Sequence, residues 1–376
     1  MPKIDPRNLR PPVFAKAFDE VPERAKNGRG AVGNAASRFD ATATSATDDG
    51  WLYEDEDAPK LRTTLHVDTS RTVINQIDSP DVGLMRSINP YRGCEHGCIY
   101  CFARPSHNYL GYSSGLDFET EIFYKPDAPD LLLRELAAKS YTVQPITLGS
   151  NTDCYQPVER EVKLTRRIVE ILHDHDHPLQ IVTKSALVLR DLDLLAAMAQ
   201  KGLASVAISV TTLDPALARV MEPRAAAPHR RLDAIRALAA AGVPVTVMAA
   251  PLIPALNDME MEKILAAAWA AGARSARYTL VRLAHDLKEL FSDWLRTHRP
   301  ERAKHVLSLI RDTRGGQLYD SRFDHRMHGT GAYADLLATR FRLATKRLGY
   351  NESHQSLRVD LFRQPNVSGQ LGFAFD

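Results

Sequence analysis

Six short apolar segments recur along this chain and constrain its fold more than any other feature of the sequence. They are mostly β-branched, as strands that are covered on both faces of a sheet usually are. We therefore predict six buried strands, at Leu84–Asn89, Gln144–Gly149, Leu179–Thr183, Ser205–Val210, Pro244–Ala249 and Ala276–Val281.

Amphipathic stretches with helical spacing separate most of these segments. They are Asp130–Lys139, Val158–His173, Leu189–Gln200, Pro228–Ala241 and Asp258–Ala271. Alternating strands and helices imply a parallel sheet with right-handed crossovers. A complete barrel of this kind has about eight such units. The pattern therefore predicts an α/β fold built on a partial (β/α)6 TIM-like barrel.

Composition divides the chain into three regions. Residues 1–60 are rich in small and polar residues and show no apolar period, so we predict a flexible or extended N-terminal arm. Within this arm, Gly28–Ala31 could touch a phosphate or a nucleic acid, although a solvated loop is the simpler interpretation. Residues 61–283 contain the predicted barrel core. Residues 284–376 are mainly helical, and we expect them to cover the barrel.

The charge balance gives no general reason to expect a polyanionic partner. Among 376 residues, 48 Lys and Arg stand against 46 Asp and Glu, for a net charge of +2. A chain this close to neutral lacks the overall attraction to nucleic acid or anionic membrane that a strongly basic protein has.

The cysteines and the N-terminus indicate the compartment. Three of the four cysteines are clustered, which is not a disulfide framework for a chain of this length and indicates reducing surroundings. The N-terminus lacks the apolar core of a signal peptide. Three prolines interrupt the longest apolar run, Val243–Leu256, which is too short to span a bilayer. We expect a cytoplasmic protein.

The clustered cysteines are Cys94, Cys98 and Cys101, which directly follow the first predicted strand. Their short spacing brings three thiolates together at little cost in loop-closure entropy, and Gly93 and Gly97 let the backbone double back. Functional groups of a β/α barrel gather where strands end and loops begin. The cysteine loop is therefore expected on the functional face.

Three thiolates suit a soft metal or an iron–sulfur cluster. With three protein ligands, one iron of a 4Fe-4S cluster would be left open for a ligand that is not protein. Two alternatives stay open: a zinc site with His96 or a distant histidine as fourth ligand, and three unrelated buried cysteines.

Other polar residues follow the later strands. Asp153 could accept bonds from an ammonium group, although Thr152 and Asp153 could equally cap a helix. Lys184 and Ser209 supply a basic group and a hydroxyl, and Ala250 leaves room for a flat ring. Together these groups would suit an amino acid joined to a nucleoside.

The C-x3-C-x2-C spacing, with the aromatic Tyr100 before the third cysteine, resembles the signature of the radical S-adenosylmethionine (SAM) superfamily. Over about residues 84–283 the chain looks most like the branch that includes spore photoproduct lyase and uncharacterised, so-called DNA repair photolyase relatives. The resemblance implies that the three cysteines bind a 4Fe-4S cluster and that SAM chelates the fourth iron. By position it implies the following SAM contacts: Thr152 and Asp153 to the amino group, Lys184 and Ser209 to the carboxylate or ribose, and Tyr100, Phe102 and Ala250 around the adenine.

The resemblance further implies an activity. An electron from a donor such as flavodoxin or ferredoxin would cleave SAM to a 5′-deoxyadenosyl radical, which abstracts hydrogen from an unknown substrate. The branch suggests a nucleic-acid lesion as one substrate class. Spore photoproduct lyase has a hydrogen-donating cysteine where this chain has Ser150, and Cys154 lies beyond Asp153 instead. Cys154 is therefore either a displaced hydrogen donor or a small buried residue.

Two other protein classes would fit the cysteines: a nucleic-acid-binding protein with a structural metal site, and a passive electron carrier.

The roles of other polar segments are ambiguous. His173, His175 and His177 look like a solvated helix end, and Arg224 could clamp an anion or form a surface ion pair. The loop Gly315–Gly331 could grip nucleic acid or close over a small-molecule site.

Overall fold

A seven-stranded sheet lies at the centre of the computed structural model, which describes residues 28–39, 61–81, 83, 86–353 and 356–366. Its order is β10-β9-β8-β7-β6-β3-β2, and every neighbouring pair is parallel except β2 with β3. The strands are β2 (Ile74–Gln76), β3 (Arg86–Ile88), β6 (Ile146–Leu148), β7 (Leu179–Thr183), β8 (Ala204–Ser209), β9 (Val245–Leu252) and β10 (Ser275–Leu280).

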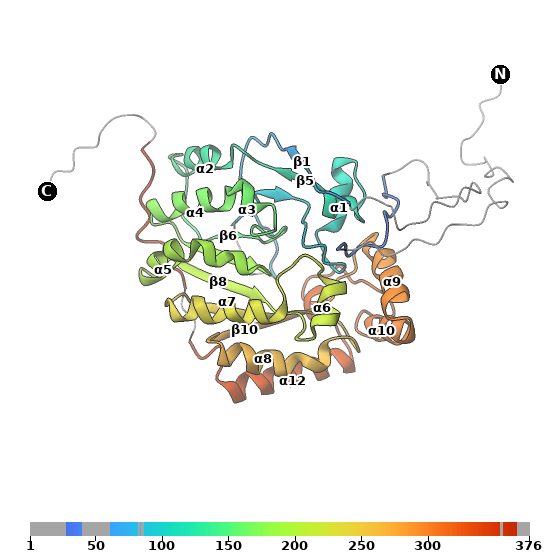
Figure 1. The fold of residues 1–376 in the computed structure, drawn as a ribbon. Helices are drawn as coiled ribbons and strands as arrows, with labels where there is room; N and C mark the ends of the chain where they lie inside the picture. The colour runs from blue at the N-terminus through green and yellow to red at the C-terminus, as the bar shows by residue number, and fades with distance from the viewer. Residues whose placement is uncertain (1–27, 40–60, 82, 84–85, 354–355, 367–376) are drawn as a thin grey trace, which may run out of the picture.

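The crossover helices lie against the outer face of this sheet (Figure 1). They are α2 (Ala128–Leu136), α4 (Leu164–Asp174), α5 (Leu192–Gln200), α7 (Pro228–Ala240) and α8 (Met261–Ala270), and α12 (Ala332–Leu348) packs on α8. Alternate strand residues such as Ile181, Val206 and Val247 are fully or almost fully buried under these helices in the main hydrophobic core. The predicted α/β partial barrel is thereby confirmed.

The opposite, concave face of the sheet carries small and polar side chains. Ser205, Thr246 and Ser275 alternate along their strands with the buried apolar residues, as the period of two in a strand requires. An eight-stranded barrel fills its interior with branched apolar side chains. Here the interior is instead open to a large cavity, which positions the site.

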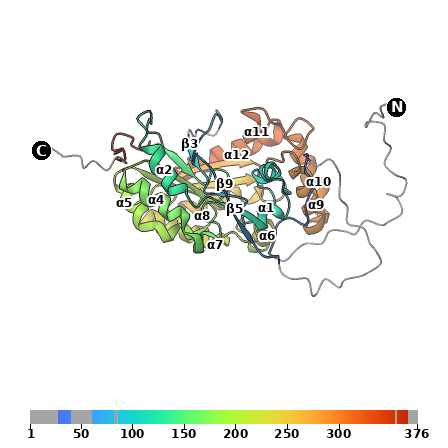
Figure 2. The ribbon, with the colours of Figure 1, turned by 90° about the horizontal axis from the view of Figure 1, so that it is seen from above.

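A smaller sheet and a second group of helices complete the fold. The sheet has the order β1-β5-β4, with β1 at Thr64–Val67, β5 at Glu121–Tyr124 and β4 at Tyr91–Arg92. Helices α9 (Leu287–His298) and α10 (Pro300–Asp312) lie beside α1 (Asp117–Thr120) and α6 (Pro215–Met221), at the end toward which β8 points (Figures 1 and 2). Helices α6, α9 and α10 contribute to a second apolar core that includes Ile99 and Trp294.

Helix α11 (His325–His328) and three short 3-10 helices, η4 (Arg104–Leu110), η5 (Ala186–Asp191) and η6 (Asp258–Glu260), connect these elements. None of the helices in the described part of the chain is long and apolar enough to cross a membrane.

The observed elements correct three details of the prediction. The helix expected over 158–173 is two helices, α3 (Glu159–Val162) and α4, because Lys163 adopts a left-handed conformation between them. His177 is buried rather than solvated, with its Nε2 2.7 Å from the hydroxyl of Tyr141.

The third correction concerns the N-terminal arm. Most of it, residues 1–27 and 40–60, lies outside the described residues. The segment Gly28–Ala31, expected as a solvated loop, instead carries a buried Arg29 and a fully buried Ala31. It is therefore an internal contact of the fold.

Candidate active site

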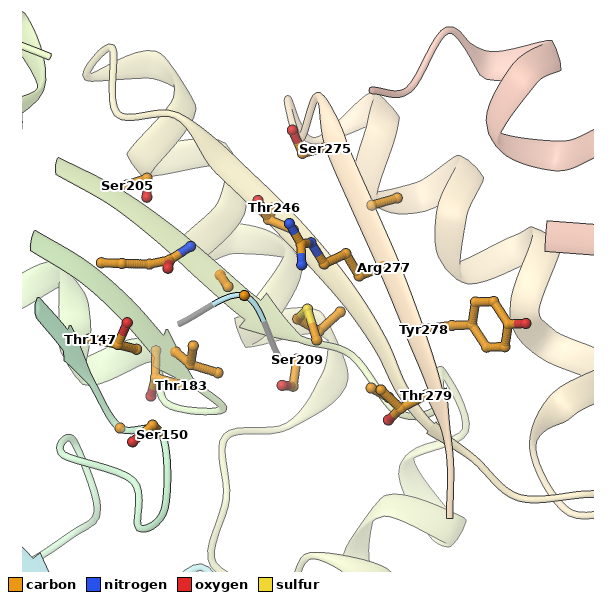
Figure 3. A pocket seen from close by; sticks show the side chains of 18 of the residues that line it. Thr147, Ser150, Thr183, Ser205, Ser209, Thr246, Ser275, Arg277, Tyr278 and Thr279 are labelled. Atoms are coloured by element: carbon orange, nitrogen blue, oxygen red, sulfur yellow. The ribbon is translucent and has the colours of Figure 1, made fainter. Parts of the chain in front are cut away.

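The three clustered cysteines line one open cavity of about 1690 Å³ that extends over the concave face of the sheet. Cys94 and Cys98 are buried, and Cys101 is partly exposed. Figure 3 shows a pocket whose wall includes the inward-facing side chains of β6 to β10. The thiols and the inner face of the barrel thus share one space.

Tight turns fold the cysteine loop. The amide of Gly97 donates to the carbonyl of Cys94 at 3.3 Å, and the amide of Cys101 donates to the carbonyl of Cys98 at 3.1 Å. Gly93 and Gly97 both have positive φ, of 77° and 65°, as the sequence led us to expect of a backbone that doubles back. The loop geometry is therefore encoded locally.

A buried ion pair supports the loop from behind. The guanidinium of Arg104 lies 2.5 Å from the carboxylate of Glu119, and both side chains are fully buried. Arg104 also donates from Nε to the carbonyl of Cys98 at 2.9 Å. Glu119 accepts from the amides of Gly30 and Ala31 at 2.9 and 2.8 Å. The segment at residues 28–31 is thereby tied to the cysteine loop.

A second carboxylate inside the loop, that of Glu95, organises its other flank. It accepts from the amide of Val158 at 2.6 Å and from the hydroxyl of Thr63 at 2.6 Å. It also lies 2.9 Å from Nη2 of Arg224. Arg224 therefore forms an ion pair within the protein, which matches the second of its two interpretations.

Burial disfavours the thiolate form of two of these cysteines, Cys94 and Cys98. Burial raises the pKa of Cys94 well above its usual value, and the charges of Asp153 and of the other two cysteines raise it further. Burial also raises the pKa of Cys98, although Lys184 opposes the shift. A metal centre would offset the desolvated negative charge of the thiolates, so the donor set fits an iron–sulfur cluster.

The described residues contain no three His, Cys, Asp or Glu side chains placed to hold one metal ion. A cubane cluster offers separate irons to separate thiolates, so its ligands need not meet at a single ion.

Asp153 lines the cavity, but protein donors already surround its carboxylate. It accepts from the Thr183 hydroxyl at 2.7 Å and the Lys184 amide at 2.8 Å, and Nδ1 of His96 lies 3.3 Å away. Burial opposes its charged form, but His96 and these donors outweigh burial and hold the pKa of Asp153 at about 2. Asp153 is therefore a charged wall residue.

Thr152, unlike Asp153, is turned into the protein. Its side chain is almost fully buried, donates to the carbonyl of Tyr91 at 2.6 Å, and does not line the cavity. The geometry gives no support to a contact between Thr152 and a ligand. Ser150 and Asn151, which precede it, do line the cavity.

The remaining expected SAM contacts do face the cavity: Tyr100, Phe102, Lys184, Ser209 and Ala250. The hydroxyl of Tyr100 donates to Glu222, and Nζ of Lys184 lies 5.7 Å from the centroid of the Tyr100 ring. The ring of Phe102 is 46% exposed, and the guanidinium of Arg282 lies 5.2 Å from its centroid. Aromatic surface and a cation thus lie beside the cysteines.

Cys154 lies apart from the residues around the cavity. It is fully buried in the main hydrophobic core and does not line the cavity. Burial, followed by the charges of Asp153 and Glu159, raises the pKa of its thiol well above the usual value. The structure therefore gives no support to Cys154 as a hydrogen donor and matches its other interpretation, a small buried residue.

The burial of several polar residues that shape the site was not predicted. Glu222 is buried against Arg231, which donates from Nη1 to the carbonyl of Ser209 at 3.2 Å. The pairs Arg104–Glu119 and Arg231–Glu222 are separated by 15 and 9 residues in sequence. No local pattern marks such pairs as buried, because their burial depends on tertiary packing.

Comparison with known proteins places the chain among enzymes. Residues 88–268 match the model of the radical SAM superfamily. The chain belongs to this superfamily and is an enzyme of this class, for which an iron–sulfur cluster and SAM are implied.

Its relatives include Uncharacterized protein Rv2578c of Mycobacterium tuberculosis, 36% identical over 251 residues, which are 66% of this chain and 74% of the relative. Uncharacterized protein MJ0683 of Methanocaldococcus jannaschii is 32% identical over 174 residues, which are 46% of this chain and 62% of that protein.

Solved structures with a similar fold include spore photoproduct lyase complexed with dinucleoside spore photoproduct, with a TM-score of 0.53 at 17% identity. A mutant of that enzyme with bound AdoMet and dinucleoside spore photoproduct also has a TM-score of 0.53, at 16% identity. Each comparison covers 76% of this chain and 80% of the other. At this identity the likeness shows the fold alone.

Proposed function

We propose that this protein is a radical SAM enzyme that holds a 4Fe-4S cluster at Cys94, Cys98 and Cys101 and reductively cleaves SAM. The cluster, when bound, supplies the electron that splits SAM into methionine and a 5′-deoxyadenosyl radical, which takes a hydrogen atom from the substrate. One observation carries the proposal. The three cysteines and five of the expected SAM contacts, Tyr100, Phe102, Lys184, Ser209 and Ala250, face a single cavity.

The residues around the cysteines have distinct proposed roles. Lys184 would neutralise the carboxylate of SAM, and Ser209 would bond this group or the ribose. Tyr100 is held in place by Glu222 and Thr211, so its ring offers a fixed surface for the adenine beside Phe102 and Ala250. Asp153 keeps its charge at neutral pH, which favours a nearby ammonium group, although protein donors occupy its oxygens.

The region boundaries and partners form part of the same proposal. Residues 61–283 would form the catalytic core, and residues 284–376 would cover it. A reduced flavodoxin or ferredoxin would deliver the electron. Because the fold neighbour binds a dinucleoside spore photoproduct, a nucleic-acid lesion is the first substrate class to test. The hydrogen donor must differ from that of spore photoproduct lyase, because Ser150 stands where that enzyme has its hydrogen-donating cysteine and Cys154 is in the core.

The test uses protein purified and reconstituted without oxygen. Dithionite and SAM are added, and 5′-deoxyadenosine is measured by mass spectrometry. The enzyme should form 5′-deoxyadenosine, Cys98→Ala should form none, and Cys154→Ala should still form it. These variants remove the same group at a cavity-facing cysteine and at a core cysteine. Tightly bound zinc without a brown chromophore or product would contradict the proposal and favour a nucleic-acid-binding protein with a structural metal site.

A further inference from the structure

The polar lining of the barrel continues across the strands outside the cysteine loop. Ser87, Thr147, Gln180 and Ser205 are neighbours in register across β3, β6, β7 and β8. All four line the cavity. Apolar side chains would fill this interior if it were a packed core. Hydroxyl and amide groups instead form a surface suited to a polar ligand.

The cavity is also larger than SAM requires. Pockets for small ligands have volumes of roughly 300–1,000 Å³, whereas this cavity is about 1690 Å³. Space therefore remains on the sheet after SAM has been placed beside the cysteines. A second molecule, the substrate, is its natural occupant.

The charge of the cavity wall is positive. Among the described residues, five Lys and Arg line it against two Asp. Both carboxylates are already paired: Asp81 with Arg326 at 2.6 Å and Asp153 with His96 at 3.3 Å. The wall is therefore arranged to attract a negatively charged group.

Arg277 is the cation best placed to bind such a group. It is exposed in the middle of β10, and Figure 3 shows its guanidinium extending over the sheet toward Thr246 of β9. In register Arg277 lies opposite Met248, so Thr246 is its diagonal neighbour on the same face. Within the described part of the chain, no ion pair or hydrogen bond engages its side chain.

The neighbours of Arg277 can complete an anion site. Ser275, two residues before Arg277, shares its face of β10 because side chains alternate along a strand, and it is paired in register with Thr246. An arginine fork binds phosphate or carboxylate in a bidentate manner, and hydroxyls can donate to the remaining oxygens. At about 3.3 Å per residue, Arg277 lies roughly 10 Å from the end of β10 at Leu280.

We propose that Arg277, with Thr246 and Ser275, forms a subsite for a phosphate or carboxylate group of the substrate. The inference rests on the proposed function, because it assigns the unfilled part of the cavity to the substrate. The subsite holds the charged end of the substrate on the sheet, so that its reacting carbon lies toward the cysteines. The substrate is therefore an oxyanion-bearing molecule rather than a neutral one.

Binding of simple anions tests the subsite without any SAM chemistry. Cluster-loaded protein is titrated with inorganic pyrophosphate and, separately, with succinate, by calorimetry and in the absence of SAM and reductant. Saturable binding of at least one anion is expected, and raising the salt concentration should weaken it. Pyrophosphate binding identifies phosphate as the group, and succinate binding identifies carboxylate.

Arg277→Gln should weaken this binding by at least about tenfold, and Arg277→Lys should recover part of it. The matched control is Arg274→Gln, which removes the same charge from the same cavity wall. The Arg274 guanidinium lies 4.1 Å from the Trp269 ring centroid and donates to the carbonyls of Trp269 and Ala273, so its loss should change binding less than twofold. Equal losses in both variants, no loss in Arg277→Gln, or no saturable binding would each overturn the inference. Failure of SAM cleavage would leave this readout unaffected.

Discussion

Gly30 lies directly against the carbonyl oxygen of Gly97, so that a Cβ atom at residue 30 would sit 1.7 Å from this oxygen. A segment that precedes the barrel by many residues thus packs against the centre of the cysteine loop. The amide of Gly30 also donates to Glu119, which holds Arg104 against the carbonyl of Cys98. The N-terminal segment therefore helps to fix the position of two cysteines.

Gly30→Ala should disrupt this packing and reduce the iron bound per chain severalfold. Backbone atoms of Gly97 must move to admit the methyl group, and overpacking of this kind costs about 1–3 kcal/mol or more. Iron and sulfide content after reconstitution measure the effect. Gly28→Ala is the control, because an added Cβ meets nothing within 4 Å there and only backbone strain at its positive φ arises. Equal iron loss in both variants would contradict the role of the Gly30–Gly97 contact.

Glu119→Gln should destabilise the protein by about 3–5 kcal/mol, because it leaves the charge of the fully buried Arg104 uncompensated. Urea unfolding of the two proteins measures this difference. Glu301→Gln, at an exposed position of α10, should change stability by less than about 0.5 kcal/mol. A Glu119→Gln protein as stable as the parent would show that the buried pair does not support the loop.

Lys184→Met should raise the SAM concentration for half-maximal 5′-deoxyadenosine formation by roughly tenfold or more, with unchanged iron content. The substitution removes one charge-assisted contact to the carboxylate of SAM, which is worth about 1.5–3 kcal/mol. Steady-state kinetics with varied SAM measure the effect, and the exposed Lys139→Met is the charge-matched control. An unchanged half-maximal concentration would remove Lys184 from the SAM site.

His107 should make the protein less stable below pH 6.5. Burial lowers its pKa from 6.5 to about 4, so the unfolded chain binds a proton that the folded protein refuses. The contribution of neutral His107 to the free energy of unfolding is complete above pH 6.5, and it decreases by about 3 kcal/mol as the pH decreases to 4. Urea midpoints across this range measure the loss, and His107→Phe should flatten the curve. The Phe side chain suits a site lined by Tyr112, Phe118 and Phe123. Parallel curves for both proteins would contradict this assignment.

The strands and most helices could be predicted because burial leaves a period in the sequence. Strand β7 has the predicted bounds, Leu179–Thr183, since its two ends coincide with the ends of an apolar run. The break at Lys163 was missed because its left-handed backbone, with φ of 53°, has no local residue signal such as glycine. Strands β1, β2, β4 and β5 were missed because each has no more than four residues and none lies in a long apolar run.

The candidate site could also be predicted only in part. The cysteine loop could be placed from spacing and from its position after a strand. The burial of Arg29–Ala31 could not, because it depends on Glu119, which is about 90 residues away. Thr152 and Cys154 were grouped with Asp153 by adjacency in sequence, but only Asp153 of the three lines the cavity. Arg277 did carry a signal, since Ser275, Arg277 and Thr279 alternate with apolar residues along β10.

The most direct test of the central claim is the electron paramagnetic resonance spectrum of the reduced, cluster-loaded enzyme with and without SAM. If three cysteines leave one iron open and SAM binds it, addition of SAM should change the spectrum of the reduced cluster. Cys154→Ala should behave like the parent, and Cys94→Ala should give no such cluster signal. A spectrum that SAM leaves unchanged at saturating concentration would contradict a radical SAM site at Cys94, Cys98 and Cys101.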